Sequence, residues 1–481
     1  MGTKSIAFIE PAGSISNVFE NYMRLPLMGT LYLGTILHNA GYKVRIYNEN
    51  LMSSPIDPFD IKADVYCISA LTVSANRAKL LAHDIKLIYP HATVIIGGIH
   101  ATLCPETFKA VADHIVYGEA ESVIVDLVEG RISGPVVQGR QVENLDDLPL
   151  VNYSLLEGSA SMDIIPIMTS RGCPFDCNFC TVTKIFGRKF RMQSPGRVVR
   201  EIQHALEFFR TRTIFFYDDN FTANRDRVTE LCRLIVQEGL DIDWVTQVRS
   251  DVANEPELLM QMEQAGCRFF FIGFESISDE TLKAMHKSQT RKDIEKSIQV
   301  IRKCGINIHG MFIFGDDHDT PATIQGTVDF AIQQHIDTVQ FMILTPFPGT
   351  ACFDDIAAKG RLVHKRWDFF NGMYAVFRPA AMSPLRLQQE TIKAYERFYS
   401  LRRLSVDALR LIVDITLDAL TWNFHSVYTY AFNTIFLKAG ARFLVGRYAK
   451  TFQHYISFLK RIEESTIIEE PEEQKVKLHE P

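Results

Sequence analysis

Short apolar runs alternate with helical periodicity through the first part of the chain. Runs rich in β-branched residues are typical of strands, and they occupy residues 4–9, 43–48, 64–69 and 92–97. Residues 27–40 and 75–89 lie between them and carry a helical pattern. Alternation of this kind predicts a doubly wound α/β domain, a parallel sheet with helices on both faces.

A second alternating series starts at residue 164. Its expected strands are 164–169, 213–217, 244–248, 269–274, 307–314 and 338–344. Its expected helices are 195–210, 225–239, 255–265, 291–304 and 321–334. Consecutive units of this kind favour a partial (β/α)6 barrel, similar to a TIM barrel, in which the chemistry takes place at the carboxyl ends of the strands.

Polar, turn-rich sequence separates the two series, and the pattern changes again after the second. The expected organisation is a Rossmann-like domain at 1–140, a linker at 141–163, a barrel at 164–360, a helical region at 361–462 and an acidic tail at 463–481. The helical region includes long aromatic-rich stretches at 384–400 and 404–460. The tail carries seven glutamates and is expected to be solvated.

Composition narrows the class of protein. The chain has 481 residues, 47% of them hydrophobic, and a formal net charge of −6, so neither a disordered chain nor a polyanion-binding protein is indicated. The apolar run at 6–9 is too short for a signal-peptide core, and a cytoplasmic location is expected. Nine cysteines in such a chain indicate thiols or metal ligands rather than a disulfide framework.

The strongest chemical motif follows the first barrel strand. The sequence Arg171-Gly172-Cys173-Pro174-Phe175-Asp176-Cys177-Asn178-Phe179-Cys180 contains three cysteines at CxxxCxxC spacing. Three thiolates can hold three irons of a [4Fe–4S] cluster and leave the fourth iron open to a substrate or cosubstrate. A zinc site is the alternative, but it usually needs a fourth Cys or His, and the loop has no histidine. Three unrelated buried cysteines are the other alternative.

With this motif, residues 164–350 resemble the core of radical SAM enzymes, in which Phe179 takes the aromatic position of the loop. The resemblance implies that S-adenosylmethionine chelates the open iron through its amino and carboxylate groups. It further implies reductive cleavage to a 5′-deoxyadenosyl radical that abstracts hydrogen from an unactivated carbon. A reducing partner of flavodoxin or ferredoxin type is implied as well.

Polar or small residues end the other barrel strands. Asp218 and Asp219 end the second, Arg249 the third, Glu275 and Ser276 the fourth, and Gly315 the fifth. The resemblance implies that Glu275 and Ser276 contact the ribose or amino group of the cosubstrate, and that Gly315 lets the adenine approach the backbone. Asp218 and Arg249 are further candidates for cofactor binding. Alternatively, the acidic residues cap the following helices and Arg249 forms a surface ion pair.

The amino-terminal domain resembles the cobalamin-binding domain of the branch that contains the anaerobic magnesium-protoporphyrin cyclase and the hopanoid methylases. The likeness lies in residues 26–33, Ser69-Ala70-Leu71, Gly97-Gly98 and 118–121. Small residues at strand ends let a cofactor approach the backbone, so Ser69, Leu71, Gly97 and Gly98 are candidates for binding cobalamin.

The motif Asp-x-His-x-x-Gly, whose histidine ligates cobalt in other cobalamin proteins, is absent. The lower face of the cobalt therefore has no assigned ligand, and His100 is expected to be a loop residue rather than a metal ligand. The alternative is a domain that kept the fold and lost the cofactor.

These observations together predict a radical SAM enzyme, most simply a cobalamin-dependent C-methyltransferase. The expected substrate is a hydrophobic small molecule such as a lipid, polyketide or tetrapyrrole, because the carboxyl-terminal region is rich in aromatic residues. An oxidative cyclase or carbon–carbon bond-forming oxidoreductase without methyl transfer is the first alternative. A non-catalytic cobalamin-binding or metal-responsive protein is the second. No single residue is indicated as the catalytic acid, base or nucleophile.

The sequence also bears on other enzyme classes and on other partners. A methylthiotransferase needs three cysteines in its amino-terminal domain, and only Cys67 and Cys104 lie there. No nucleic-acid partner is expected, and the basic residues Lys184, Arg188, Lys189 and Arg191 are interpreted as solvated or as facing the cosubstrate. Leu409–Phe436 could cover an apolar substrate or touch a membrane peripherally, although core packing also explains it.

Overall fold

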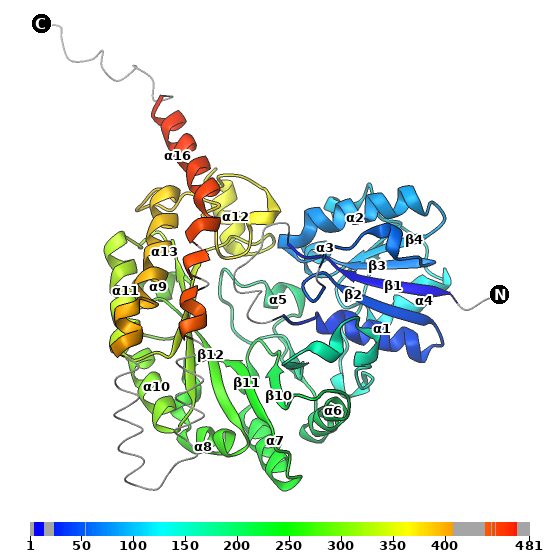
Figure 1. Ribbon diagram of the computed structural model, residues 1–481, viewed down its shortest axis with the longest axis horizontal. Coiled ribbons are helices and arrows are strands. Elements are labelled where there is room, and N and C mark those ends of the chain that lie inside the picture. Colours follow the sequence, from blue (N-terminus) through cyan, green and yellow to red (C-terminus); the bar gives the residue numbers. More distant parts are fainter. Residues whose placement is uncertain are drawn as a thin grey trace, which may run out of the picture.

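The protein contains two parallel sheets that lie beside each other, followed by a helical carboxyl-terminal region (Figure 1). The computed structural model describes residues 4–13, 24–52, 54–406, 438–443, 445–447 and 449–468. The predicted fold class, a Rossmann-like domain before a partial (β/α)6 barrel and a helical region, is confirmed.

The amino-terminal sheet has the order β2-β1-β3-β4-β5-β6 and is parallel throughout. Its strands are β1 (Ser5–Glu10), β2 (Lys43–Asn48), β3 (Val65–Ser69), β4 (Thr93–Gly97), β5 (His114–Tyr117) and β6 (Val136–Gln138). Because β1 lies between β2 and β3, the winding direction reverses at the carboxyl ends of β1 and β3, where ligands of such sheets bind. The sequence pattern missed β5 and β6, since strands of three or four residues show too few alternating positions.

Helices cover both faces of this sheet. One face packs against α1 (Met28–Asn39) and α4 (Ile124–Glu129). The other packs against α2 (Ala75–Ile88) and α3 (Ile99–Leu103). The doubly wound arrangement therefore follows from two separate apolar faces on the same strands.

The barrel sheet keeps its strands in chain order. These are β7 (Ile165–Ile167), β10 (Thr213–Phe216), β11 (Asp243–Val248), β12 (Cys267–Glu275), β13 (Asn307–Phe314) and β14 (Thr338–Ile343). The helices around them are α6 (Pro195–Phe208), α7 (Arg225–Gln237), α8 (Pro256–Gln264), α9 (Asp279–Ala284), α10 (Arg291–Lys303) and α11 (Pro321–Gln333). Within the described residues β14 does not pair with β7, so the barrel is open.

The two faces of the barrel sheet differ in burial. On β12, Phe270, Ile272 and Phe274 are fully buried and belong to the main core, whereas Phe269 and Phe271 between them are half-buried. Successive side chains of a strand point to opposite faces. The helices therefore seal one face, and the opposite inner face remains partly accessible.

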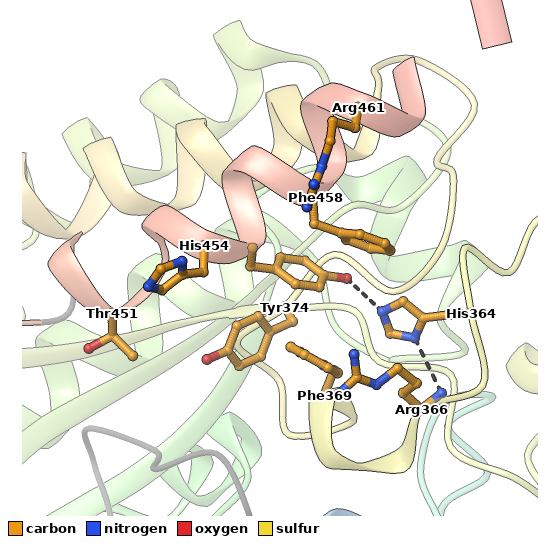
Figure 2. A pocket seen from close by; sticks show the side chains of 9 residues that line it. His364, Arg366, Phe369, Tyr374, Thr451, His454, Phe458 and Arg461 are labelled. Atoms are coloured by element: carbon orange, nitrogen blue, oxygen red, sulfur yellow. Dashed lines mark hydrogen bonds between the residues drawn. The ribbon is translucent and has the colours of Figure 1, made fainter. Parts of the chain in front are cut away.

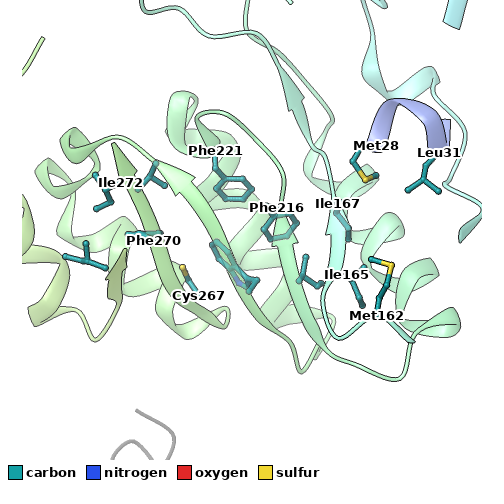
Figure 3. Packing of buried hydrophobic residues seen from close by; sticks show 14 of the residues in the cluster. Met28, Leu31, Met162, Ile165, Ile167, Phe216, Phe221, Cys267, Phe270 and Ile272 are labelled. Carbon is teal, nitrogen blue, oxygen red and sulfur yellow. The ribbon is translucent and has the colours of Figure 1, made fainter. Parts of the chain in front are cut away.

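The connection between the sheets is packed rather than loose. Leu145, Leu148, Val151 and Tyr153 are buried in the core that also contains α1 and β7. Figure 3 shows Met28 and Leu31 of α1 close to Met162, Ile165 and Ile167 at the start of the barrel. Residues 141–163, which the sequence indicates as a linker, thus fix the two sheets relative to each other.

The carboxyl-terminal region covers the open edge of the barrel. It contains α12 (Ala351–Ala358), α13 (Pro384–Phe398) and α16 (Gln453–Ile468). The hydroxyls of Tyr395 and Tyr399 accept hydrogen bonds of 2.9 Å from the backbone amides of Phe341 and Val339 on β14. These bonds satisfy the exposed edge of β14, which would otherwise offer free amides to another strand.

The sequence places the start of the acidic tail at Glu463, whereas α16 continues to Ile468. The rest of the tail and the segment Leu409–Phe436 lie outside the described residues. In the part of the chain that is described, no helix has both the length and the apolar character needed to cross a membrane.

Candidate functional site

The cysteine loop lies at the carboxyl edge of the barrel, between two short paired strands. β8 (Ser170–Arg171) precedes it and pairs in antiparallel fashion with β9 (Arg191–Met192), and α5 (Val182–Ile185) lies within it. Cys173, Cys177 and Cys180 are all half-buried, and Cys177 is near enough to contribute to the raised thiol pKa values of Cys173 and Cys180. Burial is the larger cause, and it raises the pKa of Cys180 to about 12.

The donor set of this loop fits a [4Fe–4S] cluster with one open iron. Among the described side chains, no three His, Cys, Asp or Glu groups stand close enough to ligate a single metal ion. A cluster of four irons and four sulfides is larger than one ion, so its thiolate ligands stand further apart. Three thiols without a fourth side-chain ligand therefore fit the cluster better than a tetrahedral zinc site.

Neighbouring elements hold the loop in place. The Asn178 side chain donates a 2.9 Å hydrogen bond to the carbonyl of Ala284 at the end of α9. The Asn178 carbonyl accepts a 3.1 Å bond from the amide of Cys352 at the start of α12. Phe179 is half-buried against an apolar cluster that includes Ile313 and Phe377. The aromatic position of the motif thus anchors the loop to the barrel.

Arg249, at the end of β11, contacts the same loop through Phe175. Its guanidinium carbon lies 3.6 Å from the ring centroid of Phe175, between the first two cysteines. The guanidinium is nearly buried, and within the described residues its Nε has no hydrogen-bond partner; Asp251 Oδ1 is 3.9 Å away. Arg249 is therefore a nearly buried cation beside the cysteine loop, with one long ion-pair contact to the exposed Asp251 and an Nε donor that stays free within the described residues.

The base of the loop is joined to the amino-terminal domain by a buried ionic network, called here the clamp: Glu119, Glu121, Arg171 and Arg191. Arg171, two residues before Cys173, donates 2.8 Å and 2.7 Å bonds to the carboxylates of Glu119 and Glu121. Arg191, opposite it on β9, donates to both oxygens of Glu119. Burial opposes ionisation of Glu119, yet the two guanidiniums lower its pKa.

One of the four basic residues near the cysteines, Arg191, is part of the clamp, whereas the sequence predicts a solvated residue or one that faces the cosubstrate. Lys184, Arg188 and Lys189 are exposed, as expected for solvated groups. Arg191 is 3% exposed and faces Glu119 rather than solvent or the cosubstrate. Charge runs cannot reveal such a pairing, because its partner lies 72 residues away in the sequence.

The two acidic residues at the end of β10 have different environments. Asp218 is fully buried, and its Oδ1 accepts bonds of 2.6 Å and 3.0 Å from the amides of Thr169 and Ser170. Its Oδ2 accepts from the Thr169 hydroxyl, so the Asp218 carboxylate holds the chain just before the cysteine loop. The Asp219 side chain is exposed, but the surrounding protein removes part of its hydration. This desolvation and the neighbouring charge of Asp218 raise the pKa of Asp219 to about 7.

Glu275, at the end of β12, forms a buried ion pair. Its carboxylate accepts a 2.7 Å bond from Lys287 Nζ, and both side chains are 8% exposed. Its φ of 61° is unusual for a residue other than glycine and marks local strain. The sequence did not indicate Lys287, since it lies in the connection after α9, where no strand-end pattern applies. The Ser276 hydroxyl accepts a 3.1 Å bond from the Ser278 amide.

The backbone conformation of Gly315 and its packing against α13 both require a glycine at this position. Its φ is 106°, and a Cβ there would lie 2.7 Å from Leu387 Cδ2 on α13. Its amide donates to Asp319 Oδ2 at 2.9 Å. The space beside Gly315 is thus filled by the carboxyl-terminal region, and only its backbone can face a ligand.

The carboxyl edge of the amino-terminal sheet faces this rim. Tyr217, at the end of β10, is 36% exposed and has its pKa raised to about 12 by burial and by the charges of Glu10 and Asp219. Glu10 ends β1, so the end of the first amino-terminal strand and the end of the second barrel strand lie near each other. A molecule bound at one edge is therefore within reach of the other.

The candidate cobalamin-binding residues divide into open and closed positions. Ser69, Leu71 and Gly97 are half-buried, and a Cβ at Gly97 would meet nothing nearer than 3.8 Å. Gly98 has a φ of 93°, and a Cβ there would lie 2.9 Å from the backbone of Ala70. The backbone at Gly97 thus leaves room for a ligand, whereas Gly98 is required by the contact between β3 and β4.

His100 is not a loop residue. It lies in α3, is fully buried, and contacts the hydroxyls of Thr72 and Thr107 at 3.4 Å and 3.1 Å. Burial lowers its pKa to about 4, so the imidazole is neutral. Trp367, from the segment after the barrel, packs edge-on at 5.2 Å between ring centroids. The prediction failed because the helix has only five residues and its contacts are distant in sequence.

Two family models match the chain. Residues 19–128 match the B12 binding domain, and residues 167–331 match the radical SAM superfamily. An uncharacterized methyltransferase of Pyrococcus horikoshii is 30% identical over 404 residues, which cover 78% of this chain and 88% of the relative. A bacteriochlorophyllide d C-12(1)-methyltransferase of Chlorobaculum tepidum is 30% identical over 346 residues, covering 70% and 75%.

A cyclase also appears among the relatives. The anaerobic magnesium-protoporphyrin IX monomethyl ester cyclase of Rubrivivax gelatinosus is 27% identical over 378 residues, covering 70% of this chain and 66% of the cyclase. Among solved structures, the cobalamin-dependent S-adenosylmethionine radical enzyme OxsB, with aqua-cobalamin and S-adenosylmethionine bound, has the same fold, with a TM-score of 0.65. It is 14% identical, and the match covers 96% of this chain and 80% of OxsB. The chain belongs to the family of radical SAM enzymes that carry a B12-binding domain, whose members include methyltransferases and cyclases.

Proposed function

We propose that this enzyme transfers a methyl group to an unactivated carbon of a hydrophobic small molecule. The cofactors of its family are a [4Fe–4S] cluster, S-adenosylmethionine and cobalamin. The observation that carries the proposal is that the cysteine loop lies at the barrel edge and that Glu10 and Tyr217 bring the edge of the amino-terminal sheet near it. Methyl transfer between two cofactors requires such an arrangement.

Cys173, Cys177 and Cys180 would ligate the cluster. When bound, the cluster and S-adenosylmethionine supply the 5′-deoxyadenosyl radical, and cobalamin supplies the methyl group. Phe179 and Arg249 keep the loop in position, and the free Nε of Arg249 can donate to an anionic group of the cosubstrate. Asp218 acts through the backbone that enters the loop rather than by direct contact.

The remaining rim residues would orient the cosubstrate. The Glu275 carboxylate, held by Lys287, is suited to accept from an amino or ribose group. Ser276 and the backbone of Gly315 border the same edge. On the facing edge, Ser69, Leu71, Gly97 and Gly98 would border cobalamin, with the open space at Gly97 next to the ring system. His100 is buried and hydrogen-bonded, so it offers no ligand to cobalt.

The inner face of the barrel supports a hydrophobic substrate. Phe269, Phe271, Met311 and Met342 are half-buried there, and the Phe271 ring lies 4.8 Å from that of His309. Burial lowers the pKa of His309 to about 4, so this imidazole is neutral. A face of apolar rings with uncharged polar groups excludes water from a radical and suits an apolar molecule. Because Leu409–Phe436 lies outside the described residues, the inner face of the barrel is the structural support for a hydrophobic substrate.

The electron would come from a small flavodoxin- or ferredoxin-type protein. Lys184 is exposed on the same loop as the cysteines, beside Arg188 and Lys189, which form exposed ion pairs with Asp176 and Glu143. An acidic carrier would be attracted to Lys184 and could compete for the two paired cations. Peripheral membrane contact through Leu409–Phe436 remains a prediction from sequence alone.

The test is anaerobic reconstitution followed by reaction with S-adenosylmethionine labelled with deuterium in its methyl group. We expect both iron and cobalt in the protein, deoxyadenosine after reduction, and a product that has gained one labelled methyl group. The triple variant C173A/C177A/C180A should lose iron and deoxyadenosine formation, whereas C304A, at another half-buried cysteine, should retain both.

Two results would contradict the proposal. A dehydrogenated or cyclised product without the label would assign the enzyme to the cyclase class. Reduced protein that contains iron and cobalt but produces no deoxyadenosine would indicate a binding protein.

A further inference from the structure

A separate cavity lies in the carboxyl-terminal region. Its volume is about 350 Å³, within the range of small-molecule sites, and none of the proposed cofactor ligands lines it. One wall comes from the segment His364–Tyr374 after the barrel, and the other from α16 and the residues before it (Figure 2). The proposed function makes no use of this cavity.

The walls of the cavity are aromatic and well ordered by mutual contacts. Phe369 stacks on Tyr455 with 4.9 Å between ring centroids, and Tyr374 meets Tyr455 edge-on at the same distance. The Tyr455 hydroxyl donates a 3.0 Å bond to the carbonyl of Ala375 and lies 3.0 Å from His364 Nε2. Phe458 completes the wall. These rings form a preformed apolar surface with little rotational freedom left to lose.

The rim of the cavity is basic. Arg366, His454 and Arg461 are exposed, and no acidic residue is among the lining side chains. In the parts of the chain that the structure covers, neither Arg366 nor Arg461 forms an ion pair; Arg366 lies 4.8 Å above the Phe369 ring. Arg366 comes from one wall and Arg461 from the other (Figure 2). Two guanidiniums without recorded carboxylate partners, one of them above the Phe369 ring, match an anionic group attached to a ring system.

We propose that this cavity binds a planar aromatic or conjugated molecule that carries a carboxylate. Its ring system contacts Phe369, Tyr455 and Phe458, and its carboxylate pairs with one of the two rim guanidiniums, Arg366 or Arg461. Arginine suits a carboxylate because the planar guanidinium can donate two parallel hydrogen bonds. The inference is independent of the proposed methyl transfer, since it concerns binding alone.

The segment that forms one wall of the cavity also contacts the amino-terminal domain. Between the wall residues Arg366 and Phe369, Trp367 packs on His100, and Asp368 accepts a 2.6 Å bond from the Asn76 side chain. The segment that forms one wall therefore rests with its other side on the amino-terminal domain.

The test is a fluorescence titration of the full-length protein with 1-pyrenebutyrate, and with 1-pyrenebutanol as the uncharged probe of the same shape. We expect pyrenebutyrate to bind about tenfold more tightly than pyrenebutanol. The variant R366Q/R461Q should remove this preference and leave pyrenebutanol binding unchanged. The control R200Q/R210Q, which changes two exposed arginines at and just after α6, should behave as wild type.

A second variant tests the aromatic wall independently. F458A should weaken binding of both probes by a similar factor, because it removes ring contact and leaves the guanidiniums in place. Circular dichroism verifies that each variant is folded. The proposal is overturned if wild type binds both probes equally, if R366Q/R461Q keeps the preference for pyrenebutyrate, or if F458A binds both probes as wild type does.

Discussion

The carboxyl edges of the two sheets face each other but offer different chemistry. At the amino-terminal edge, the Glu10 carboxylate accepts from the Leu27 amide, the Thr30 hydroxyl and the Asn48 side chain, so it is occupied by the protein. At the barrel edge, the buried Nε of Arg249 has no partner within the described residues, and Asp219 is open to solvent. One edge offers backbone and space, whereas the other offers charged side chains, including an Arg249 Nε that is free within the described residues.

This difference matches the two kinds of molecule that the family binds. A small molecule with several charged groups, such as S-adenosylmethionine, is oriented by charged donors and acceptors, and the barrel edge carries side chains of this kind. A large ring system needs an unobstructed backbone surface, which Gly97 leaves at the other edge. The four predictions that follow would break or sharpen this contrast.

The largest effect is expected at the clamp, where the two edges are joined. Replacing Glu119 by Gln leaves Arg171 and Arg191 buried without a full counter-charge, so the free energy of unfolding should fall by about 3–5 kcal/mol. Iron retention should fall too, because both ends of the cysteine loop are held there. Urea unfolding and iron analysis measure these effects.

A matched control for the clamp is E129Q, which removes one partner of the exposed Arg131–Glu129 pair. Its effect on the free energy of unfolding should stay below about 1 kcal/mol. If E119Q were no more damaging than E129Q, the two edges would be held together by the apolar core alone.

The next effect contrasts two adjacent glycines on the amino-terminal edge. G98A places a Cβ at positive φ and 2.9 Å from the Ala70 backbone, so it should lower the free energy of unfolding by about 2–4 kcal/mol. G97A meets nothing closer than 3.8 Å and should change stability by less than about 1 kcal/mol, yet weaken hydroxocobalamin binding. Thermal unfolding and a cobalamin titration separate the two. Equal behaviour of both variants would mean that the edge is not divided into closed and open positions.

The third effect concerns the pH dependence of Glu10. Burial raises its pKa from 4.5 to about 7, with hydrogen bonds from Thr30, Leu27 and Asn48 opposing the shift. Between these two values the folded protein holds more protons than the unfolded chain. The stability contributed by protonated Glu10 is therefore complete below pH 4.5 and is lost as the pH rises to about 7.

The variant E10Q lacks this titration. Relative to E10Q, wild type should lose about 3 kcal/mol of unfolding free energy between pH 4.5 and pH 8. Urea unfolding of both proteins across this range measures the difference. If the unfolding free energies of wild type and E10Q changed with pH in the same way, Glu10 would be ionised in the folded protein and this edge would carry a charge.

Sequence alone predicted the strands and the cysteine loop better than the contacts around them. β13 occupies Asn307–Phe314 as predicted, because a long apolar run has a strong period, and the three cysteines are close since they share one short loop. By contrast, Lys287 beside Glu275 and Trp367 beside His100 are pairings between distant segments. Such pairings depend on how helices, strands and loops pack together in three dimensions, which no local sequence pattern encodes.

The smallest effect sharpens the barrel side of the comparison. R249K keeps the positive charge but loses the flat guanidinium 3.6 Å from Phe175 and its free Nε donor. Because a lysine ammonium cannot stack in the same way, the rate of deoxyadenosine formation at low S-adenosylmethionine should fall about tenfold. The control R268K, at the exposed pair of Arg268 with Asp243, should leave that rate unchanged. An unaffected kcat with a raised KM would assign Arg249 to cosubstrate binding, whereas a lowered kcat with unchanged KM would assign it to positioning of the cysteine loop. Unchanged values of both would remove the contrast, because the barrel edge would then bind its cosubstrate without the free Nε of Arg249.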